Sequence, residues 1–444
     1  MGQTDLTTGG IYKSLVKYAA PVVGSNLLQA LYGLVDTIVA GQFIGSDALS
    51  GLTNANTVIN MFTQIILGLC MGGGILIGQY YGARDRKNGH EATATLFTGS
   101  LLAGLFALLL LFFGSRGLLT VLGAPALEEA DIYLRVCAVG FLFIGGYNGA
   151  AAALRAVGNS RAPLVCVAAT AAVNVVLDIL FVVGFGMGVF GAGLATVISQ
   201  AMSFFVAVYY LFRDPETFGL RPGKLYLRRD KLRRELKLGI PCAVQMSVAA
   251  ISWLSVTFLI NSYGVTVSAG NGVSNRIKEF CQLFITAMTT ATASMIAQNM
   301  GAGHYDRARK TTYSAMKITV AMALFIIALV QCLAPRMVGL FTADPATAAA
   351  AVRNLRVEIF GQVFYAVFLV YHGLMLGSGD TWFVFLSSFI NCILARVTLG
   401  IAFNAVWGLD GIYFACMLAP FTSVPFGIWY ERSGRWRRSI LQGK

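Results

Sequence analysis

Long apolar stretches alternate with short polar segments along the whole chain. Each stretch is close to the roughly 20 residues that a helix needs to cross the hydrocarbon core of a bilayer. The pattern therefore predicts an all-α polytopic membrane protein with about twelve spanning helices and no soluble domain. The predicted spans are residues 11–39, 49–80, 93–113, 132–154, 164–183, 191–211, 236–262, 269–300, 312–333, 352–376, 382–405 and 411–429.

The second half of the chain repeats the first at an offset of about 220 residues. Four segments recur in the same order. They are KYAAPVV and KLGIPCA, GQYYGARDRK and AQNMGAGHYDRARK, LRAVGNSRAP and LMLGSGDTWF, and GMGVFGAGLAT and VWGLDGIYFAC. Four ordered matches at nearly one offset indicate an internal duplication.

Each copy holds six predicted spans, and an even number of spans returns the chain to its starting side. We therefore expect two six-helix lobes related by a parallel pseudo-two-fold repeat, with the axis along the membrane normal. The N-terminal lobe would comprise residues 1–213 and the C-terminal lobe residues 235–444. Residues 214–234 are rich in Lys and Arg and read as a basic cytoplasmic linker.

Composition and charge placement agree with a membrane protein. The chain of 444 residues is 57% hydrophobic and 12% charged, whereas soluble domains average about 25% charged residues. The net charge of +13 would also suit nucleic acid, but Lys and Arg fall in alternate loops, which is the positive-inside pattern. We therefore expect a monomer in the plasma (cytoplasmic) membrane, with both termini cytoplasmic, lipid around it and no nucleic-acid partner.

Two isolated aspartates lie inside the predicted spans. Asn174 and Asp178 are four residues apart, so a helix places them on one face, and Asp36 lies in the first span. A charged residue at the middle of a membrane helix costs about 2.5–3.5 kcal/mol and usually faces a cavity or a partner. The equivalent positions of the second copy hold no acid. The pattern favours a cation site, with helix-locking hydrogen bonds as the alternative.

The predicted spans contain other polar residues besides these acids. Gln29 and Tyr32 share a helix face with Asp36, which predicts a stripe lining the cavity of the N-terminal lobe; a seam between helices is the alternative. Arg276 and Glu279 have the spacing of an ion pair within one helix. The sequence has no GxSxG, HExxH or GxxxxGK[ST] motif, so we predict neither an enzyme nor an ATP-driven pump, and no cofactor.

These features together resemble the multidrug and toxic compound extrusion (MATE) family. The resemblance rests on the twelve spans in two lobes and on the similar segments 79–83 and 298–302. It also rests on the spacing of Pro21 and Asp36 in the first span and of Asn174 and Asp178 in the fifth. It implies an antiporter that is coupled to H⁺ or Na⁺ and expels amphipathic, often cationic compounds by alternating access. It also implies a hinge at Pro21 and a cation site. The implied site residues are Asp36, Asn174, Asp178 and Thr196, with Asn148 as a further member.

The resemblance sets further expectations. If Na⁺ is the coupling ion, Asp36 and Asp178 would be the metal ligands. One branch of the family also carries acids inside helices 7 and 10. Here the seventh span offers only Gln245 and the tenth reads QVFYAVFLVYHG, which favours the branch whose acids are confined to the N-terminal lobe.

Two other functions are compatible with the sequence. A lipid-linked oligosaccharide flippase of the same wider superfamily would need a cavity lined with several arginines, for which Arg155, Arg276 and Arg396 are candidates. A non-transporting membrane scaffold or receptor is the alternative of another class. Such a protein would have no need of two isolated acids inside its spans.

Overall fold

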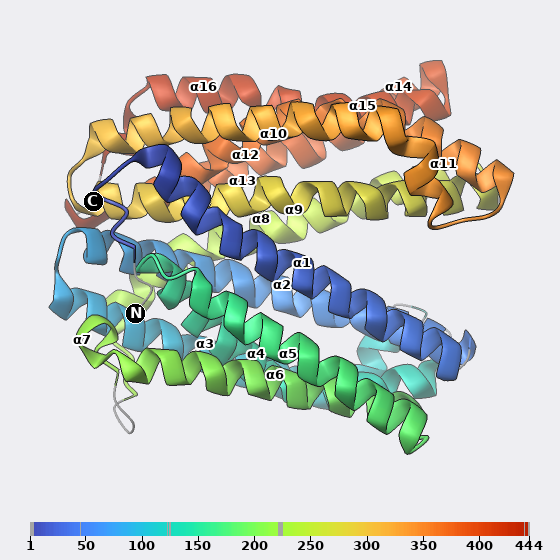
Figure 1. Ribbon diagram of the computed structural model, residues 1–444, viewed down its shortest axis with the longest axis horizontal. Helices are drawn as coiled ribbons and strands as arrows, with labels where there is room; N and C mark the ends of the chain where they lie inside the picture. Colours follow the sequence, from blue (N-terminus) through green and yellow to red (C-terminus); the bar gives the residue numbers. More distant parts are fainter. Residues whose placement is uncertain are drawn as a thin grey trace. The chain divides into compact units, whose positions relative to one another are not determined.

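The computed structural model confirms an all-helical membrane protein (Figure 1). It describes residues 4–44, 46–121, 123, 126–220, 225–438 and 440–442. In these residues twelve helices are long and apolar enough to span a membrane, as predicted. Part of the predicted linker, residues 221–224, lies outside the described residues.

The helices divide between the two halves of the chain that repeat each other in sequence. The first half contains α1 (Ile11–Phe43), α2 (Ser46–Gly82), α3 (Arg86–Val121), α4 (Leu127–Ala156), α5 (Arg161–Asp178), the π-helix η1 (Ile179–Gly184), α6 (Gly188–Arg213) and the short α7 (Pro215–Phe218). The second half contains α8 (Arg229–Asn261), α9 (Val265–Gly301), α10 (Tyr305–Gly339), α11 (Pro345–Glu358), α12 (Gly361–Ser378), α13 (Thr381–Phe389), the π-helix η2 (Ile390–Val397), α14 (Thr398–Trp407), α15 (Leu409–Thr422) and α16 (Val424–Arg432). The chain ends in the 3₁₀ turns η3 (Arg435–Arg437) and η4 (Ile440–Gln442).

The chain forms two compact units, and the division between them falls inside two helices. Unit 1 contains Gly24–Ala243, and unit 2 contains Leu6–Val23 and Val244–Lys444. The start of α1 therefore belongs to unit 2, and the start of α8 belongs to unit 1. In both helices the division comes two residues after a proline, Pro21 in α1 and Pro241 in α8. The two sequence copies thus divide at equivalent positions.

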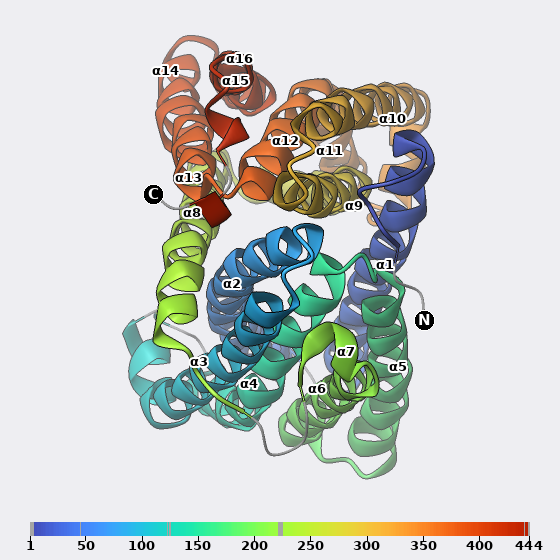
Figure 2. The same ribbon diagram turned by 90° about the vertical axis from the view of Figure 1, so that its left-hand side faces the viewer.

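The core of unit 1 is built around α4, which packs against α2, α3 and α6 (Figure 2). Glycines allow the helix backbones to approach closely. A Cβ atom on Gly104 of α3 would lie 2.5 Å from the carbonyl oxygen of Phe141, and one on Gly145 of α4 would lie 3.1 Å from the Cα of Gly104. Such small residues are the usual means of close helix packing in membranes, where burial of apolar surface drives helix association only weakly.

In unit 2, the first residues of the chain are held against the end of α9. The Leu6 N–H donates to Gln298 Oε1 at 3.1 Å, and the Asn299 side chain donates to the Leu6 carbonyl at 3.1 Å. Further along α1, the hydroxyls of Tyr18 and Ser294 are 3.0 Å apart. Figure 2 shows the start of α1 beside α9 and α10. The repeated glutamine segment is therefore a structural anchor in this unit.

One turn shows the repeat at the level of the backbone. Gly158 follows α4 with φ 86°, and Gly379 follows α12 with φ 85°. After each glycine, the next N–H donates to a carbonyl five residues back at 3.0 Å. A positive φ favours glycine because a Cβ atom is crowded there. The two copies thus share this helix ending, as the alignment of LRAVGNSRAP with LMLGSGDTWF predicts.

The structure departs from the predicted spans at three places. The predicted span 352–376 is two helices, because α11 ends at Glu358 and α12 begins at Gly361. Asp344 caps α11 by accepting from the Thr347 N–H at 2.9 Å, so α11 begins well before residue 352. The fifth and eleventh spans each contain a π-helix, η1 and η2. The predicted linker contains α7 and the first turns of α8.

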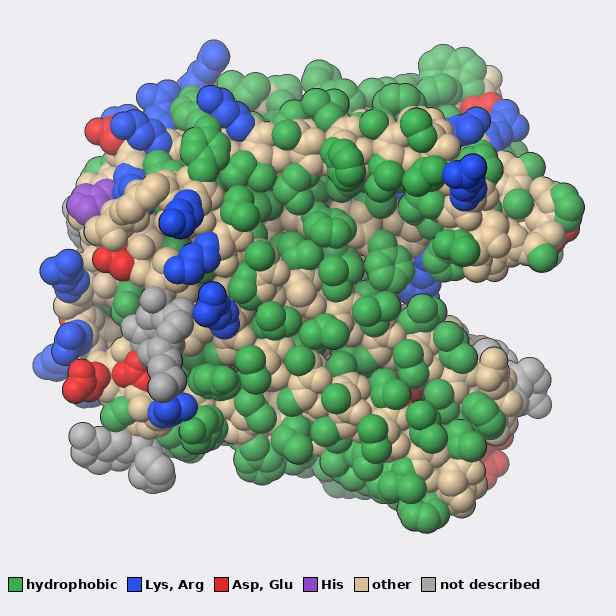
Figure 3. Space-filling model, in the orientation of Figure 1, with side chains coloured by type: hydrophobic (Ala, Val, Ile, Leu, Met, Phe, Trp, Pro, Cys, Tyr) green, Lys and Arg blue, Asp and Glu red, His purple; other side chains and the backbone are tan. Residues whose placement is uncertain are grey.

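The surface of each unit is that of a membrane protein. Figure 3 shows hydrophobic side chains along the flanks of the helices, while Lys and Arg gather near helix ends. Large apolar side chains such as Phe113 and Phe258 are 78% exposed. Exposed apolar surface of this extent is costly in water and suits contact with lipid.

The close contact of α3 with α4 yields a prediction about stability. Gly104→Ala places a methyl group against backbone atoms that cannot move independently, and we expect it to destabilise the protein by about 1–3 kcal/mol. Gly117→Ala in the same helix has open space around its Cβ and should be neutral or stabilising by up to about 1 kcal/mol. The apparent midpoint of thermal unfolding of the purified variants measures this. Equal midpoints for the two variants would contradict the packing argument.

Candidate functional site

The end of α5 brings two polar side chains into the interior of unit 1. Asn174 and Asp178 lie one helical turn apart, and Asp178 is the last residue of α5 before η1 begins. Their side chains lie on one face, as the four-residue spacing predicts. Asp178 is fully buried and Asn174 is 2% exposed. π-Helical segments are rare and often mark functional positions.

The carboxylate of Asp178 has no hydrogen-bond partner among the described residues. Neither Oδ1 nor Oδ2 is satisfied, and the same holds for Asn174 Oδ1. Burying a charged group without compensation costs several kcal/mol, so nearly all buried charges in proteins are paired. Three buried oxygens on one helix face are therefore available to a proton or a cation.

Asp36 adds a second carboxylate to this region. It lies in the part of α1 that belongs to unit 1 and is partly buried. It is near enough to Asp178 for the two charges to interact, and it also interacts electrostatically with Tyr32 and Tyr133. Two like charges in a poorly solvated interior repel each other, and a cation between or beside them relieves that repulsion.

Thr196 and Tyr133 extend the cluster from α6 and α4. The Thr196 hydroxyl donates to the Ala192 carbonyl at 3.0 Å and lies beside the phenol of Tyr133. Its oxygen keeps lone pairs that can accept a hydrogen bond or bind a cation. Tyr133 is not predicted from the sequence, because a tyrosine in an apolar span cannot be distinguished there from an ordinary core residue. Only its burial, at 1% exposure, and its closeness to Asp36 distinguish it.

For the remaining predicted residues, the described part of the chain shows no hydrogen bond to the two aspartates. Asn148 of α4 donates its side-chain amide to the Ile144 carbonyl of the same helix at 2.9 Å, not to either aspartate. On α1, Gln29 is exposed and Tyr32 is partly buried. Pro21 lies inside α1, which stays helical through it. The cluster in unit 1 therefore centres on Asp36, Asn174, Asp178 and Thr196, with Tyr133 added.

The donor set defines what this cluster can hold. It consists of two carboxylates, an amide oxygen and hydroxyl groups, which suit a proton or a hard cation such as Na⁺. The described residues contain no group of three or more His, Cys, Asp or Glu placed to bind a metal ion. The thiol of Cys137 lies beside the phenol of Tyr133, but the oxygen donors of Asp36, Asn174 and Asp178 favour a hard cation over a transition metal.

Unit 2 contains a second buried polar cluster, around a cavity of about 130 Å³. Its lining includes Trp253, Lys278, Glu358 and Arg396. Lys278 and Glu358 form a buried ion pair. Glu358 is not apparent from the sequence, because residues 352–376 are predicted as one span whose middle holds no acid. The predicted pair of Arg276 with Glu279 is confirmed at 3.3 Å, on an exposed face of α9.

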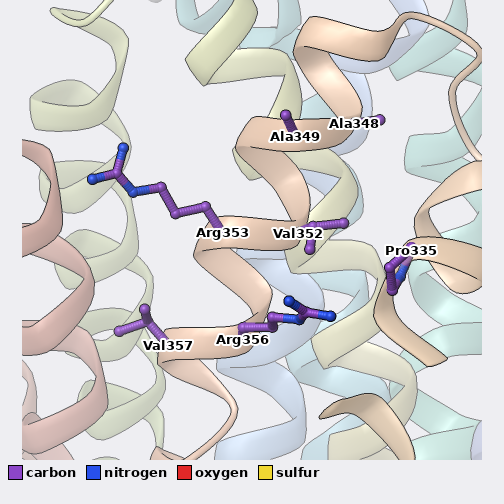
Figure 4. Close-up of a pocket in the computed structure, with 7 residues that line it drawn as sticks. All are labelled: Pro335, Ala348, Ala349, Val352, Arg353, Arg356 and Val357. Carbon is purple, nitrogen blue, oxygen red and sulfur yellow. The ribbon is translucent and has the colours of Figure 1, made fainter. Parts of the chain in front are cut away.

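A larger hollow, of about 630 Å³, lies beside α10 and α11 in unit 2 (Figure 4). Its walls are mostly apolar. Figure 4 shows the side chains of Arg353 and Arg356 leaving α11 in different directions. Arg353 is already paired with Asp410. This hollow is therefore lined mainly by apolar side chains, unlike the two buried polar clusters.

Known proteins resemble the chain over its whole length. A family model described as MatE matches residues 21–180 and again residues 241–402, one match on each sequence copy. The probable multidrug resistance protein YpnP of Bacillus subtilis is 29% identical over 445 residues, which cover 98% of each chain. The multidrug export protein MepA of Staphylococcus aureus is 23% identical over 415 residues, 92% of this chain and 91% of that protein.

A solved structure agrees with this result. It is described as the outward-facing conformation of a multidrug resistance MATE family transporter of the MOP superfamily. It superposes on this chain with a TM-score of 0.91 at 22% identity, over 96% of each chain. At this identity the likeness establishes the fold.

Proposed function

The chain belongs to the MatE family of membrane transporters, and we propose that it is an antiporter exporting amphipathic, often cationic compounds in exchange for H⁺ or Na⁺. It is not an enzyme. Relatives named as multidrug resistance or export proteins support the class of cargo. The positive-inside pattern supports a cytoplasmic membrane location with both termini in the cytoplasm.

The observation that carries this proposal is the fully buried carboxylate of Asp178, whose oxygens have no partner among the described residues. A residue needed only for folding would be expected to be paired, since an unpaired buried charge destabilises the fold. A coupling residue must instead bind and release an ion during each cycle. Asp178, with Asp36 close enough to interact, meets that requirement.

Antiport requires that the ion and the substrate favour different conformations, because a ligand shifts an equilibrium only by its difference in affinity between two states. We propose that ion binding at Asp36 and Asp178 draws the unit 1 part of α1 inward and bends the helix near Pro21. A proline lacks one helical hydrogen bond, so bending there costs least. The division of α1 just after Pro21 supports this hinge.

The alternative functions find less support. A flippase of lipid-linked oligosaccharides predicts several arginines around one cavity. Among Arg155, Arg276 and Arg396, only Arg396 lines the buried cavity of unit 2, while Arg276 is paired with Glu279 at an exposed position. A scaffold or receptor offers no reason for the unpaired acid of unit 1.

Neutralising the acid tests the proposal. We expect Asp178→Asn, which keeps the shape of the side chain, to reduce gradient-driven dye efflux from everted vesicles at least about tenfold, or about 1.4 kcal/mol in the barrier. Asp131→Asn is the matched control, because Asp131 of the same unit is paired with Arg135 at 3.0 Å. It should transport normally. Normal efflux by Asp178→Asn, at equal amounts of inserted protein, would remove Asp178 from the coupling mechanism.

The hinge gives a second prediction. Pro21→Ala restores a helical hydrogen bond and stiffens α1, so we expect turnover in proteoliposomes to fall about tenfold, or about 1.4 kcal/mol in the barrier. Dye binding to the detergent-purified variant should change much less. Pro335→Ala, in α10 and away from the division between the units, is the control. If Pro21→Ala turns over like the control, α1 does not bend there during transport.

A further inference from the structure

We propose that unit 2 contains a binding site for the carboxylate group of an organic ligand, built around Arg396. The proposal concerns unit 2 alone and does not depend on cation coupling in unit 1. Three features support it: the charge balance of the buried cavity, the surroundings of Arg396 and the aromatic side chains of the cavity walls.

Arg396 is a buried cation without a counter-charge. It is 6% exposed, its Nε has no hydrogen-bond partner among the described residues, and no described carboxylate forms an ion pair with it. Guanidinium groups stay charged in proteins. The cation is therefore held in a poorly solvated interior, where an anion would be bound strongly.

The nearby charges do not neutralise it. Lys278 and Glu358 also line the cavity, but they pair with each other, and the Lys278 ammonium lies 3.5 Å from Asn354 Oδ1. One positive and one negative charge cancel. The cavity thus retains one net positive charge, that of Arg396. His372, which also lines it, is buried against the ring of Phe368 and lies 3.5 Å from the Ser388 hydroxyl.

The guanidinium is held by a contact with an aromatic ring. It stacks on the ring of Trp253 at 4.5 Å from the ring centroid, a contact that holds an arginine in place and is worth up to about 2 kcal/mol when desolvated. Arg396 lies in the π-helix η2, whose wider turn changes the direction of its side chains. A fixed, planar fork of donors is the arrangement that binds a carboxylate through two parallel hydrogen bonds.

Two amides supply further polar groups. Gln362 and Asn391 line the same cavity, and each has a buried side-chain oxygen without a hydrogen-bond partner among the described residues. Either amide can turn to present its NH₂ group instead, because the two orientations occupy the same space. The cavity can therefore offer neutral donors beside the charged ones of Arg396.

The walls indicate an organic anion. Trp253, Tyr365 and Phe368 provide aromatic surface around the polar groups, and the volume of about 130 Å³ suits a group of roughly the size of benzoate. This aromatic surface favours the flat organic part of a ligand, and the polar side chains in the rest of the lining, such as Arg396 and Gln362, suit its carboxylate. We therefore assign the site to a carboxylate attached to an aromatic or similarly flat group.

The test compares two probes of the same shape on purified protein without any ion gradient. 4-Fluorobenzoate carries the carboxylate and 4-fluorobenzamide is its neutral counterpart. Binding of each is followed by the broadening of the ligand ¹⁹F NMR line, with chloride added as a competitor in a separate titration. We expect the benzoate to bind at least tenfold more tightly than the benzamide, and chloride to compete poorly.

Variants locate the site. Arg396→Gln should weaken benzoate binding at least tenfold and leave benzamide binding unchanged, while Arg396→Lys, which keeps the charge but not the planar fork, should lie between. Arg276→Gln, an exposed arginine of the same unit, is the control and should bind like the unaltered protein. Equal affinities for the two probes, undiminished binding by a folded Arg396→Gln, or equally strong competition by chloride would each overturn the proposal. The probe comparison on the unaltered protein decides the matter even if the variants fold poorly.

Discussion

The cost of an unpaired charge in a poorly solvated interior is the constraint on which this structure depends. Most polar groups inside the helices are satisfied locally, often by donating to a carbonyl one turn back. Asp178 is an exception, because its buried oxygens have no partner among the described residues. The fold thus maintains a site whose stability depends on what binds there.

Each unit contains a buried charged side chain without a full set of partners among the described residues, and the two side chains have opposite charge. The fifth span carries Asp178 next to η1, and the equivalent eleventh span carries Arg396 within η2. In both spans the polar side chain lies at a π-helical segment and lacks a full set of protein partners in the described part of the chain. A duplicated framework has therefore acquired an acidic interior in unit 1 and a basic one in unit 2. The two interiors suit ligands of different charge.

The sequence was sufficient to predict the spans, the duplication and the acidic pair, because these depend on hydrophobic length and on the rarity of acids in membrane helices. It did not predict the π-helices or the break after Glu358, which depend on local hydrogen bonding that hydropathy does not record. The roles of Tyr133 and Arg396 depend on neighbours from other helices. Their environment becomes visible only once α1, α4 and α8 are placed.

The central claim is that ion and substrate compete through the acids of unit 1. The direct measurement is the affinity of the purified protein for a cationic dye such as rhodamine 6G, followed by fluorescence anisotropy over a range of pH and of Na⁺ concentration. Protonation or Na⁺ binding at Asp36 and Asp178 should weaken dye binding at least tenfold, as the pH falls or as Na⁺ rises, and Asp178→Asn should abolish that dependence. A dye affinity that is independent of both ions, or that depends on them equally in the variant, would contradict the account.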